Sequence, residues 1–397
     1  MNQPGPNDAA GPRTSRGPLT LSPRHDHAGA PRAWDAADDL LLAAVQGTAP
    51  AVVAEDLEEL LPDRSALHGR AVVAEERHGA LTAAWDPVPV GVVVDSWSSE
   101  RAALANLLAN GGDPAALWWR TPLEQLPQPI ELLVLRPGRD NARLGFLLEQ
   151  VAPRLAPDAV VLGSSMVHHL HRSTLELIES TVGPTRTTRA HRRARLLVAR
   201  PSETDRTTPA PTTFDARGMT VVGWPGVFGA TGLDPGAQLL LSTLPPAPDT
   251  QRAIDLCCGT GVLATALAHH CPDSEVLAVD DSAIAVDAAR RTFAANGCPN
   301  RVRAVQGDVL TLRDGEVPDG SVDLVVCNPP FHDDRTVTDE IAWRCIVASR
   351  RALRRGGELR LVANRHLGHH TRLRRVFGNC DILASDRRFV VLTARRP

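Results

Sequence analysis

Two short motifs in the second half of the chain combine residue types that could do chemistry. One is Asp255-x-x-x-Gly259-x-Gly261, and the other is Asn328-Pro329-Pro330-Phe331. Glycines in a turn between a strand and a helix let the backbone approach a ligand closely, because no Cβ is in the way. Two successive prolines stiffen a loop and remove two N–H donors from it. The pair of motifs predicts a ligand-binding turn beside a rigid loop that presents acceptors.

The Asn-Pro-Pro-Phe loop is suited to holding a planar amine. The side-chain oxygen of Asn328 and the carbonyl of Pro329 can each accept one N–H, which draws the nitrogen toward a tetrahedral geometry. The lone pair then points at an activated methyl group, so that positioning replaces a strong base. Pro330 keeps the loop rigid, and Phe331 offers a flat face to a base taken out of its stack. His332 is a further candidate for substrate contact, although a histidine beside a loop is more often a bystander.

Carboxylates near the ends of expected strands complete a candidate cofactor site. Asp255 opens the glycine motif, Asp280 follows Gly259 by 21 residues, and Asp308 ends the third expected strand. Asp280 can accept hydrogen bonds from both hydroxyls of a ribose, and Asp308 can accept one from an adenine amino group. These features predict S-adenosylmethionine as the cofactor, with Asn328 beside both the cofactor and the amine.

Two other interpretations of the glycine motif remain open from the turn alone. Residues 259–264 also satisfy the dinucleotide pattern G-x-G-x-x-A, and a glycine-rich turn can simply join a strand to a helix. The Asn-Pro-Pro-Phe loop argues against a dehydrogenase, because it supplies no hydride site. The same loop, placed after a fourth buried strand, also argues against a merely structural turn.

The elements around these motifs are typical of an α/β protein with a doubly wound parallel sheet, because apolar strands alternate with amphipathic helices. In such sheets ligands bind outside the carboxyl ends of the strands. The loops that carry Gly259, Asp280 and Asn328 would therefore meet at one edge. Strands are expected at residues 252–256, 276–280, 303–308, 322–327, 357–362 and 388–393.

The first half of the chain resembles a degenerate duplicate of the second. Residues 71–81 can be laid over 253–263, so that Gly79 falls on Gly261 while Arg77 falls on Gly259. Residues 92–95 fall on the strand that ends at Asp280, and residues 131–138 fall on 323–330, with Arg136 in place of Asn328. An arginine where the glycine turn should be blocks close approach of a cofactor. The first copy is therefore expected to have lost its chemistry.

Length and composition set the domain plan and the protein class. A chain of 397 residues is too long for one ordinary domain. We expect a disordered leader at 1–32, a degenerate domain at 33–200, a linker at 201–213 and a catalytic domain at 214–397. No stretch is apolar enough to span a membrane, and none of the seven cysteines forms a CxxC pair. These features predict a cytoplasmic protein, monomeric and without a metal site.

Arginine is unevenly distributed, although the formal net charge is only −3. Residues 186–200 contain six arginines and no acid, among them Arg192 and Arg193. Residues 335–397 contain 15 arginines, Arg365 among them, against five acids. One such run is usually a solvated surface, but arginine pairs with phosphates and stacks on bases. Two runs, one closing each half, predict RNA binding.

At these residues the chain resembles the RsmC/RlmG family of ribosomal RNA guanine-N2 methyltransferases. The resemblance implies two tandem class I (Rossmann-like) methyltransferase domains, the N-terminal one degenerate. It also implies cofactor contacts at Gly259, Gly261, Asp280 and Asp308, and amine contacts at Asn328 and Pro329. The resemblance covers nearly the whole chain after the leader and includes residues 226–228, 233–241, 255–261, 328–332, 362–367 and 377–380.

Residues 34–38, 173–177 and 337–343 are closer to the branch of the family that acts on 23S ribosomal RNA. Three alternatives stay open. One is methylation of 16S ribosomal RNA, and another is N-methylation of an adenine or of a protein glutamine. The third is a non-catalytic RNA-binding ribosome assembly factor. That role predicts a broken glycine turn in both halves, whereas only the first is broken.

Overall fold

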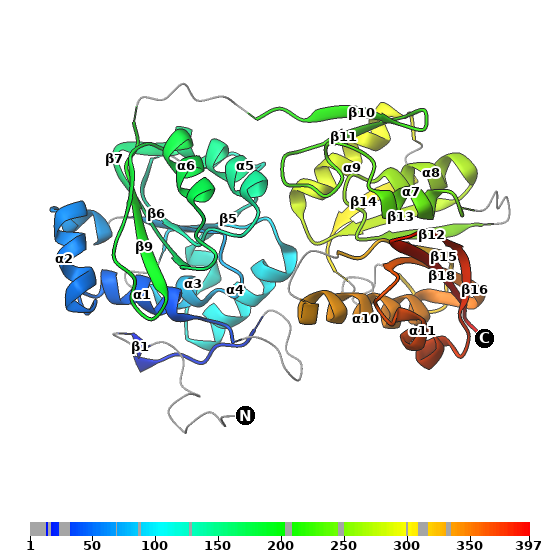
Figure 1. The fold of residues 1–397 in the computed structure, drawn as a ribbon, viewed down its shortest axis with the longest axis horizontal. Helices are drawn as coiled ribbons and strands as arrows, with labels where there is room; N and C mark the ends of the chain where they lie inside the picture. The colour runs from blue at the N-terminus through cyan, green and yellow to red at the C-terminus, as the bar shows by residue number, and fades with distance from the viewer. Residues whose placement is uncertain are drawn as a thin grey trace. The chain divides into compact units, whose positions relative to one another are not determined.

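The chain forms two compact units, residues 1–209 and 210–397, and each contains a seven-stranded sheet with helices on both of its faces (Figure 1). The structure is a computed structural model. It describes residues 13–14, 17–23, 32–68, 70–85, 89–126, 129–202, 209–244, 250–298, 301–308, 317–330 and 335–397.

The sheet of the second unit has the strand order β14-β13-β12-β15-β16-β18-β17. The five strands from β14 to β16 are parallel, and β18 and β17 follow as an antiparallel hairpin. The order reverses between β12 and β15, and ligands bind at such a switch point. The strands are β12 (Arg252–Leu256), β13 (Glu275–Asp280), β14 (Val302–Gln306), β15 (Val322–Cys327), β16 (Leu353–Asn364), β17 (Asp381–Ser385) and β18 (Phe389–Arg395).

Apolar residues on both faces of this sheet are covered by helices, which is why its central strands are almost continuously buried. One face packs against α7 (Pro235–Leu241), α8 (Val262–His270) and α9 (Ala283–Ala295). The other packs against α10 (Arg335–Ala352) and α11 (His369–Phe377). A separate hairpin, β10 (Thr212–Ala216) and β11 (Met219–Gly223), lies beside α9.

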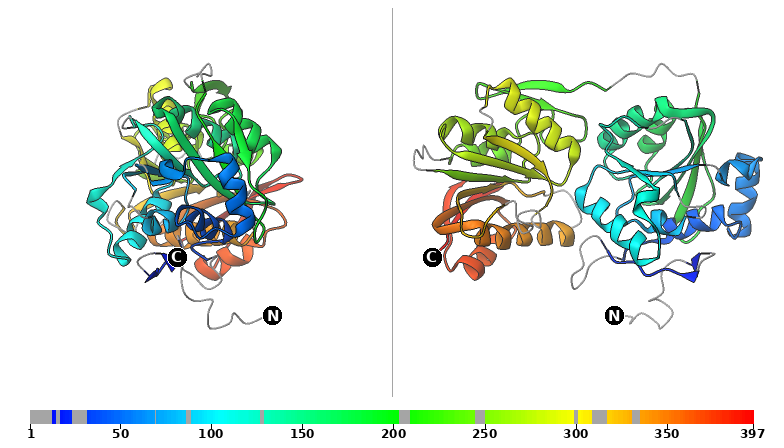
Figure 2. Two further views of the ribbon diagram at one scale, coloured as in Figure 1. Left: turned by 90° about the vertical axis from the view of Figure 1, so that its left-hand side faces the viewer. Right: turned by 180° about the vertical axis from the view of Figure 1, so that it is seen from behind.

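The first unit repeats this plan with the strand order β5-β4-β3-β6-β7-β9-β8. The right-hand view of Figure 2 shows the sheet of each unit from behind. The strands of the first unit are β3 (Ala71–Ala74), β4 (Gly91–Val93), β5 (Trp118–Arg120), β6 (Ile130–Leu135), β7 (Leu155–Met166), β8 (Thr185–Thr187) and β9 (Ala194–Ala199). Its helices are α1 (Ala36–Val45), α2 (Ala51–Leu60), α3 (Ala80–Ala84), α4 (Trp97–Ala109), α5 (Asn141–Val151) and α6 (Arg172–Thr181). Three short 3₁₀ turns lie at Arg64–His68, Pro114–Ala116 and Ala152–Arg154, and a short hairpin pairs β1 (Arg13–Thr14) with β2 (Gly17–Pro18).

The expected α/β fold of two tandem domains is confirmed, and the strand registers show how the halves correspond. Ala74 pairs with Leu135 as Leu256 pairs with Cys327, so Arg136 occupies the position of Asn328. The backbone turn is also shared, because Gly79 and Gly261 have φ of 77° and 76°.

One part of the expected overlay shifts by a residue. Ala74 pairs with Val93 as Leu256 pairs with Val279, which places Val94 at the position of Asp280. Asp95 corresponds to Asp281 instead. The first unit therefore has no carboxylate at the strand end where the second unit has Asp280.

The segment expected to be a disordered leader contains an ordered part. Leu19 is buried in the core of the first unit, and Thr20 exchanges two backbone hydrogen bonds with the side chain of Asn110, at 3.0 and 2.8 Å. In the second unit Thr220 of β11 makes the same pair of bonds with Asn296, at 3.0 and 2.7 Å. The segment is hydrophilic overall, but it contributes the counterpart of a strand to the domain.

The expected linker also ends earlier than residue 213. Thr212 is already the first residue of β10, and its hydroxyl donates to the carbonyl of Ala230 at 3.0 Å. Residues 203–208 of the linker lie outside the described residues. Among the helices that the structure describes, none combines the length and the apolar character needed to cross a lipid bilayer.

A first prediction concerns the shared glycine. A Cβ on Gly261 would lie 2.8 Å from the Cβ of Ala289 on α9, whereas one on Gly297, which also has positive φ, meets nothing within 4 Å. Gly261→Ala should therefore lower the free energy of unfolding by about 1–3 kcal/mol more than Gly297→Ala, because it adds overpacking to the same backbone strain. Urea unfolding of both variants measures the difference, and equal losses would mean that only the backbone conformation matters.

Candidate active site

Asn328 lies at the carboxyl end of β15, buried beside the N-terminus of α7. Its amide nitrogen donates to Oδ2 of Asp234 at 3.4 Å, and Asp234 caps α7 by accepting from the Ala237 N–H at 2.9 Å. An ionised carboxylate can only accept, so it turns the NH₂ end of the amide toward itself. The other end, Oδ1 of Asn328, is buried and has no hydrogen-bond partner among the described residues. The site thus holds an amide oxygen that is oriented and desolvated.

The two prolines continue this loop, Pro329 buried and Pro330 partly exposed. Neither has an N–H, so this stretch offers the Pro329 carbonyl without a competing donor of its own. The expected stacking residue Phe331 and the tentative contact His332 lie outside the described residues. Their roles stay predictions.

The glycine turn joins β12 to α8 next to the same edge of the sheet. The N–H of Gly259 donates to Oδ2 of Asp280 at 2.9 Å, so the turn is tied to the end of β13. Gly259 has φ of 51°, and a Cβ there would lie 3.1 Å from the Phe228 carbonyl. Gly261 makes a different contribution, because its missing Cβ lets α8 approach α9. Of the two expected cofactor glycines, Gly259 forms the turn and Gly261 packs behind it.

Asp255 is fully buried beneath this turn. Its Oδ2 accepts from the backbone N–H of Ala264 in α8 at 3.0 Å, while its Oδ1 has no partner among the described residues. Burial raises the pKa of the Asp255 carboxyl well above its ordinary value. A buried polar oxygen of this kind calls for a hydrogen-bond partner, and a polar group of a ligand would supply one.

Asp280 ends β13 and faces the turn from the other side. Its two oxygens accept from the N–H groups of Ser282, at 3.0 Å, and Gly259, at 2.9 Å. Burial, together with the neighbouring Cys257, raises the pKa of Asp280 to about 7 despite these two hydrogen bonds. Each carboxylate oxygen has a second lone pair, so both can still accept a ligand hydroxyl.

Asp308 follows β14 at the same edge, where it was expected to meet an adenine amino group. Its carboxylate pairs with the guanidinium of Arg344 on α10 at 2.7 Å, and both side chains are largely buried. This pair fixes the direction of the carboxylate at the end of β14. Arg344 lies 36 residues away in the sequence, and no motif pointed to it.

Two more residues near the site were not singled out by the chemistry of the motifs. Asp234 appeared only within a family segment, although an Asp one residue before Pro235 is a typical helix N-cap. Phe228, in another such segment, has its carbonyl near Gly259, and the residue is 43% exposed. The backbone of Phe228 therefore leaves little room for a side chain at position 259.

Three thiols converge behind the two loops. Cys257, Cys327 and Cys345 have sulfur atoms within 4.8 Å of one another and pack against one apolar cluster. A metal site was not expected from the sequence, because these residues are far apart and form no CxxC pair. Three thiols are one ligand fewer than a structural zinc site uses, and their surroundings are apolar.

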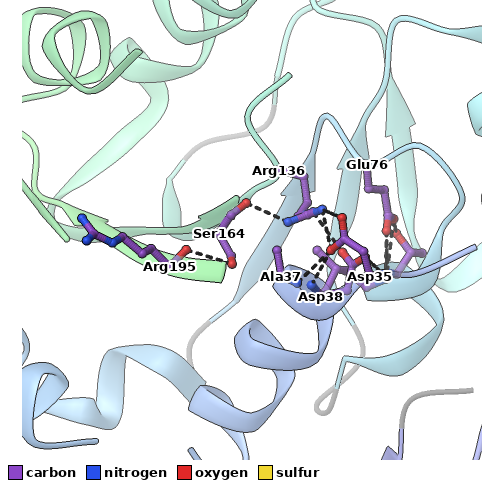
Figure 3. Close-up of polar contacts among 9 residues, drawn as sticks. Asp35, Ala37, Asp38, Glu76, Arg136, Ser164 and Arg195 are labelled. Carbon is purple, nitrogen blue, oxygen red and sulfur yellow. Dashed lines mark hydrogen bonds and ion pairs between the residues drawn. The ribbon is translucent and has the colours of Figure 1, made fainter. Parts of the chain in front are cut away.

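The corresponding place in the first unit is filled by ion pairs. Arg136 stands where Asn328 stands, and it pairs with Asp35 at 3.0 Å and Asp38 at 2.9 Å while donating to the Ser164 carbonyl (Figure 3). Asp35 caps α1 as Asp234 caps α7. Because the arginine side chain satisfies the carboxylates itself, no oriented acceptor is left there.

The turn of the first unit is closed in the same way. Glu76 is buried and accepts from the N–H groups of Leu81, at 2.9 Å, and Thr82, which are the donors at the start of α3. Burial raises the pKa of Glu76 to about 7 even though the Thr82 hydroxyl also donates to it. The first unit therefore keeps the fold of the site and fills it with its own side chains.

The expected RNA contacts lie on the surface of their units. Arg192 and Arg193 are exposed at the turn between β8 and β9 and have φ of 47° and 62°. Arg365 is exposed directly after β16, and its guanidinium donates to the Asp386 carbonyl at 2.9 Å. Since β16 runs parallel to β15, Arg365 lies at the same edge of the sheet as Asn328.

Comparison with known proteins agrees with this architecture. The family described as RLMG N-terminal domain matches residues 13–203, and the family described as Methyltransferase small domain matches residues 218–393. A protein of Streptomyces coelicolor named Ribosomal RNA large subunit methyltransferase G is 40% identical, over 91% of this chain and 94% of its own length. A protein of the same name from Aeromonas salmonicida is 35% identical, over 96% of this chain and 95% of its own length.

A solved structure shares the two-domain fold. It is described as the 16S rRNA N2 methyltransferase RsmC of T. thermophilus in complex with AdoMet and guanosine. The TM-score is 0.72 with 21% sequence identity, and the match covers 96% of each chain.

A second prediction tests whether ion pairs hold the first unit together where the second has its site. Arg136→Leu leaves the buried Asp38 without its partner, which should cost about 3 kcal/mol of unfolding free energy at pH 8. Burial raises the pKa of Asp38 to about 6 although Arg136 opposes this, so at pH 5 the carboxyl is protonated and the loss should be smaller. Urea unfolding at both pH values measures the effect.

The matched control is Arg172→Leu, which removes an exposed arginine that pairs with Glu176 on the surface of α6. It should cost well under 1 kcal/mol at either pH. A loss for Arg136→Leu that is small, or that does not change between pH 5 and pH 8, would contradict the assignment.

Proposed function

Because the chain belongs to the family of ribosomal RNA large subunit methyltransferase G proteins, we propose that it methylates the exocyclic N2 amine of a guanine in 23S ribosomal RNA. The methyl donor is S-adenosylmethionine. Residues 214–397 carry the reaction, and the degenerate domain at 33–200 recognises RNA. We further propose that the protein acts as a monomer in the cytoplasm.

The observation that carries the proposal is the orientation of Asn328. Its Oδ1 is buried without a partner among the described residues, while its NH₂ group is held by Asp234. A hydroxyl or a ring nitrogen could use one such acceptor, but an exocyclic amine has two N–H groups and matches two. The carbonyl of Pro329 supplies the second, and neither Pro329 nor Pro330 has an N–H that could compete for it.

The cofactor site fits the same chemistry. A nucleoside with a charged amino acid tail needs ribose acceptors, a close backbone approach and a buried carboxylate. Asp280, Gly259 and Asp255 offer these at neighbouring strand ends. We expect Asp308, which Arg344 holds by an ion pair, to accept from the adenine amino group. When bound, S-adenosylmethionine supplies an electrophilic methyl group on a sulfonium.

The residues of the chain then act on the amine alone. Asn328 and Pro329 accept its two N–H groups, which directs the nitrogen lone pair at the methyl carbon. With the lone pair held in this direction, the nitrogen would take the methyl group from the sulfonium, and the electron pair of the broken S–C bond would stay on sulfur. The methylated amine is acidic and loses one proton to solvent, so the site needs no strong base.

A third prediction tests this function. Ribosomal RNA from a strain that lacks the gene should lose one N2-methylguanine in 23S rRNA, and the wild-type gene should restore it. Asn328→Ala should not restore it, since the amine keeps only one acceptor. The mark is measured by mass spectrometry of ribonuclease fragments. An unchanged set of N2-methylguanines in both strains would refute the proposal. Loss of a mark in 16S rRNA, or of a methylated adenine, would show that the substrate is that RNA or that base instead of a guanine in 23S rRNA.

Asp234 provides a graded variant for the same assay. Asp234→Ser keeps a helix cap but lacks the carboxylate that orients Asn328. It should fold as the wild type does and lower kcat about tenfold with little change in KM, because the amide can then rotate. If Asp234→Ser has wild-type turnover, then Asp234 caps the helix without orienting Asn328.

A fourth prediction follows from the pKa of Asp280. With a pKa of about 7, this carboxyl is mostly ionised at pH 8 and mostly protonated at pH 6. Only the ionised form accepts both ribose hydroxyls, so the Kd for S-adenosylmethionine should rise roughly tenfold as pH falls from 8 to 6. Calorimetry should find weak, pH-independent binding in Asp280→Asn.

Asp386→Asn is the matched control for this titration. Backbone N–H groups of Phe389 and Arg388 lower the pKa of Asp386, so that carboxyl stays ionised between pH 6 and pH 8. This variant should show the wild-type pH dependence. A pH-independent Kd in the wild type would remove Asp280 from the cofactor site.

A further inference from the structure

The tip of the β17–β18 hairpin is a rigid turn that presents two arginines. Asp386 Oδ1 accepts from the backbone N–H groups of Arg388 and Phe389, both at 2.7 Å. The carboxylate is therefore used to hold the backbone of the turn. Arg387 and Arg388 are exposed, and neither forms an ion pair with a carboxylate of the described residues.

Arg365 fastens this tip to the end of β16. Its backbone N–H donates to the Arg388 carbonyl at 3.0 Å, and its guanidinium donates to the Asp386 carbonyl at 2.9 Å. The guanidinium of Arg388 lies 5.3 Å from the centre of the Phe389 ring, a cation–π distance. Three arginines are thus held around one turn, with backbone carbonyls and an aromatic ring as their neighbours.

This cluster adjoins the catalytic loop. The buried ring of Phe389 lies 3.5 Å from where a Cβ of Gly236 would be, two residues beyond Asp234. Asp234 in turn holds Asn328. Phe389, the neighbour of Arg388, therefore lies beside the start of the helix whose cap residue accepts from the amide nitrogen of Asn328.

The first unit also has a hairpin tip with two arginines, and it is bonded to the end of the preceding long strand. The backbone N–H of Val167 donates to the Arg193 carbonyl at 2.7 Å, as that of Arg365 donates to Arg388. Arg192 and Arg193 occupy this turn with positive φ, where glycine or asparagine would be relaxed. An arginine pair on the last hairpin is thus present in both halves, although only one half keeps a reactive site.

We propose that Arg365, Arg387 and Arg388 form a phosphate-binding subsite for the RNA strand on either side of the target nucleotide. This inference rests on the proposed function. A base that leaves its stack to reach Asn328 brings its flanking phosphates to the rim of the site. One guanidinium group can bind two phosphate oxygens at once, and the fixed turn lowers the entropy lost on binding. The subsite reads the backbone, so it adds affinity without base specificity.

The test measures the binding of a 23S rRNA fragment by fluorescence anisotropy at several salt concentrations. Arg387→Gln/Arg388→Gln should weaken binding at least tenfold. It should also reduce the slope of log Kd against log salt by about 1.4, since roughly 0.7 is lost for each phosphate contact to a single strand. The Kd for S-adenosylmethionine, measured by calorimetry, should stay unchanged.

Arg355→Gln is the control, because Arg355 is exposed near the start of β16, at the opposite edge of the sheet. It should leave the salt slope as in the wild type. The proposed subsite is wrong if the double variant keeps the wild-type affinity and slope. It is also wrong if Arg355→Gln loses as much RNA affinity per removed charge as the double variant does. The two proposals fail separately, because the N2-methylguanine mark and its dependence on Asn328 are measured without these variants.

Discussion

The structure of the second unit depends on one constraint, which is that an amide side chain must be buried with its oxygen free. A buried amide without partners is unfavourable, and it would rotate to satisfy whichever end it could. Asp234 prevents this by engaging the NH₂ end of Asn328, and the same carboxylate caps α7. The helix cap and the orientation of the acceptor are therefore one interaction. The remaining elements serve to bring the ends of β12, β13, β14 and β15 to that place.

The two halves differ in the residue at the end of the strand that carries the site, which is Asn328 in the second unit and Arg136 in the first. They share strand order, turn conformation and helix caps, so the backbone does not decide between them. Arg136 forms an ion pair with Asp35, the cap residue that corresponds to Asp234, and Glu76 accepts from the N–H groups at the start of α3. In the first unit the carboxylates Asp35 and Asp38 at this place are compensated by Arg136. In the second unit Asp255 and Asn328 each keep a buried oxygen without a partner among the described residues, which is the signature of a site that awaits a donor.

Positive charge follows the same duplication. Each unit ends in a hairpin whose tip carries two arginines and is tied to the preceding long strand by one backbone hydrogen bond. The net charge of the chain gives no sign of this, because acidic residues elsewhere balance it. What matters for an anionic partner is that the arginines gather at the carboxyl edge of the sheet in the unit that keeps Asn328. The degenerate half still presents an exposed arginine pair at the tip of its last hairpin.

The sequence alone determined the α/β fold, the duplication and the loops that hold Gly259 and Asn328, because hydrophobic periodicity and glycine or proline turns are local properties. The overlay of the two halves also placed Arg136 at the position that corresponds to Asn328. Only the tertiary structure decided which atoms meet. Asp234 reaches Asn328 across 94 residues and Arg344 reaches Asp308 across 36, and no local pattern encodes such pairs. Strand register assigned Val94, and not Asp95, to the place of Asp280, since pairing across a sheet is fixed by packing. The order of residues 19–23 likewise comes from contacts with α4, a helix more than 70 residues further along the chain.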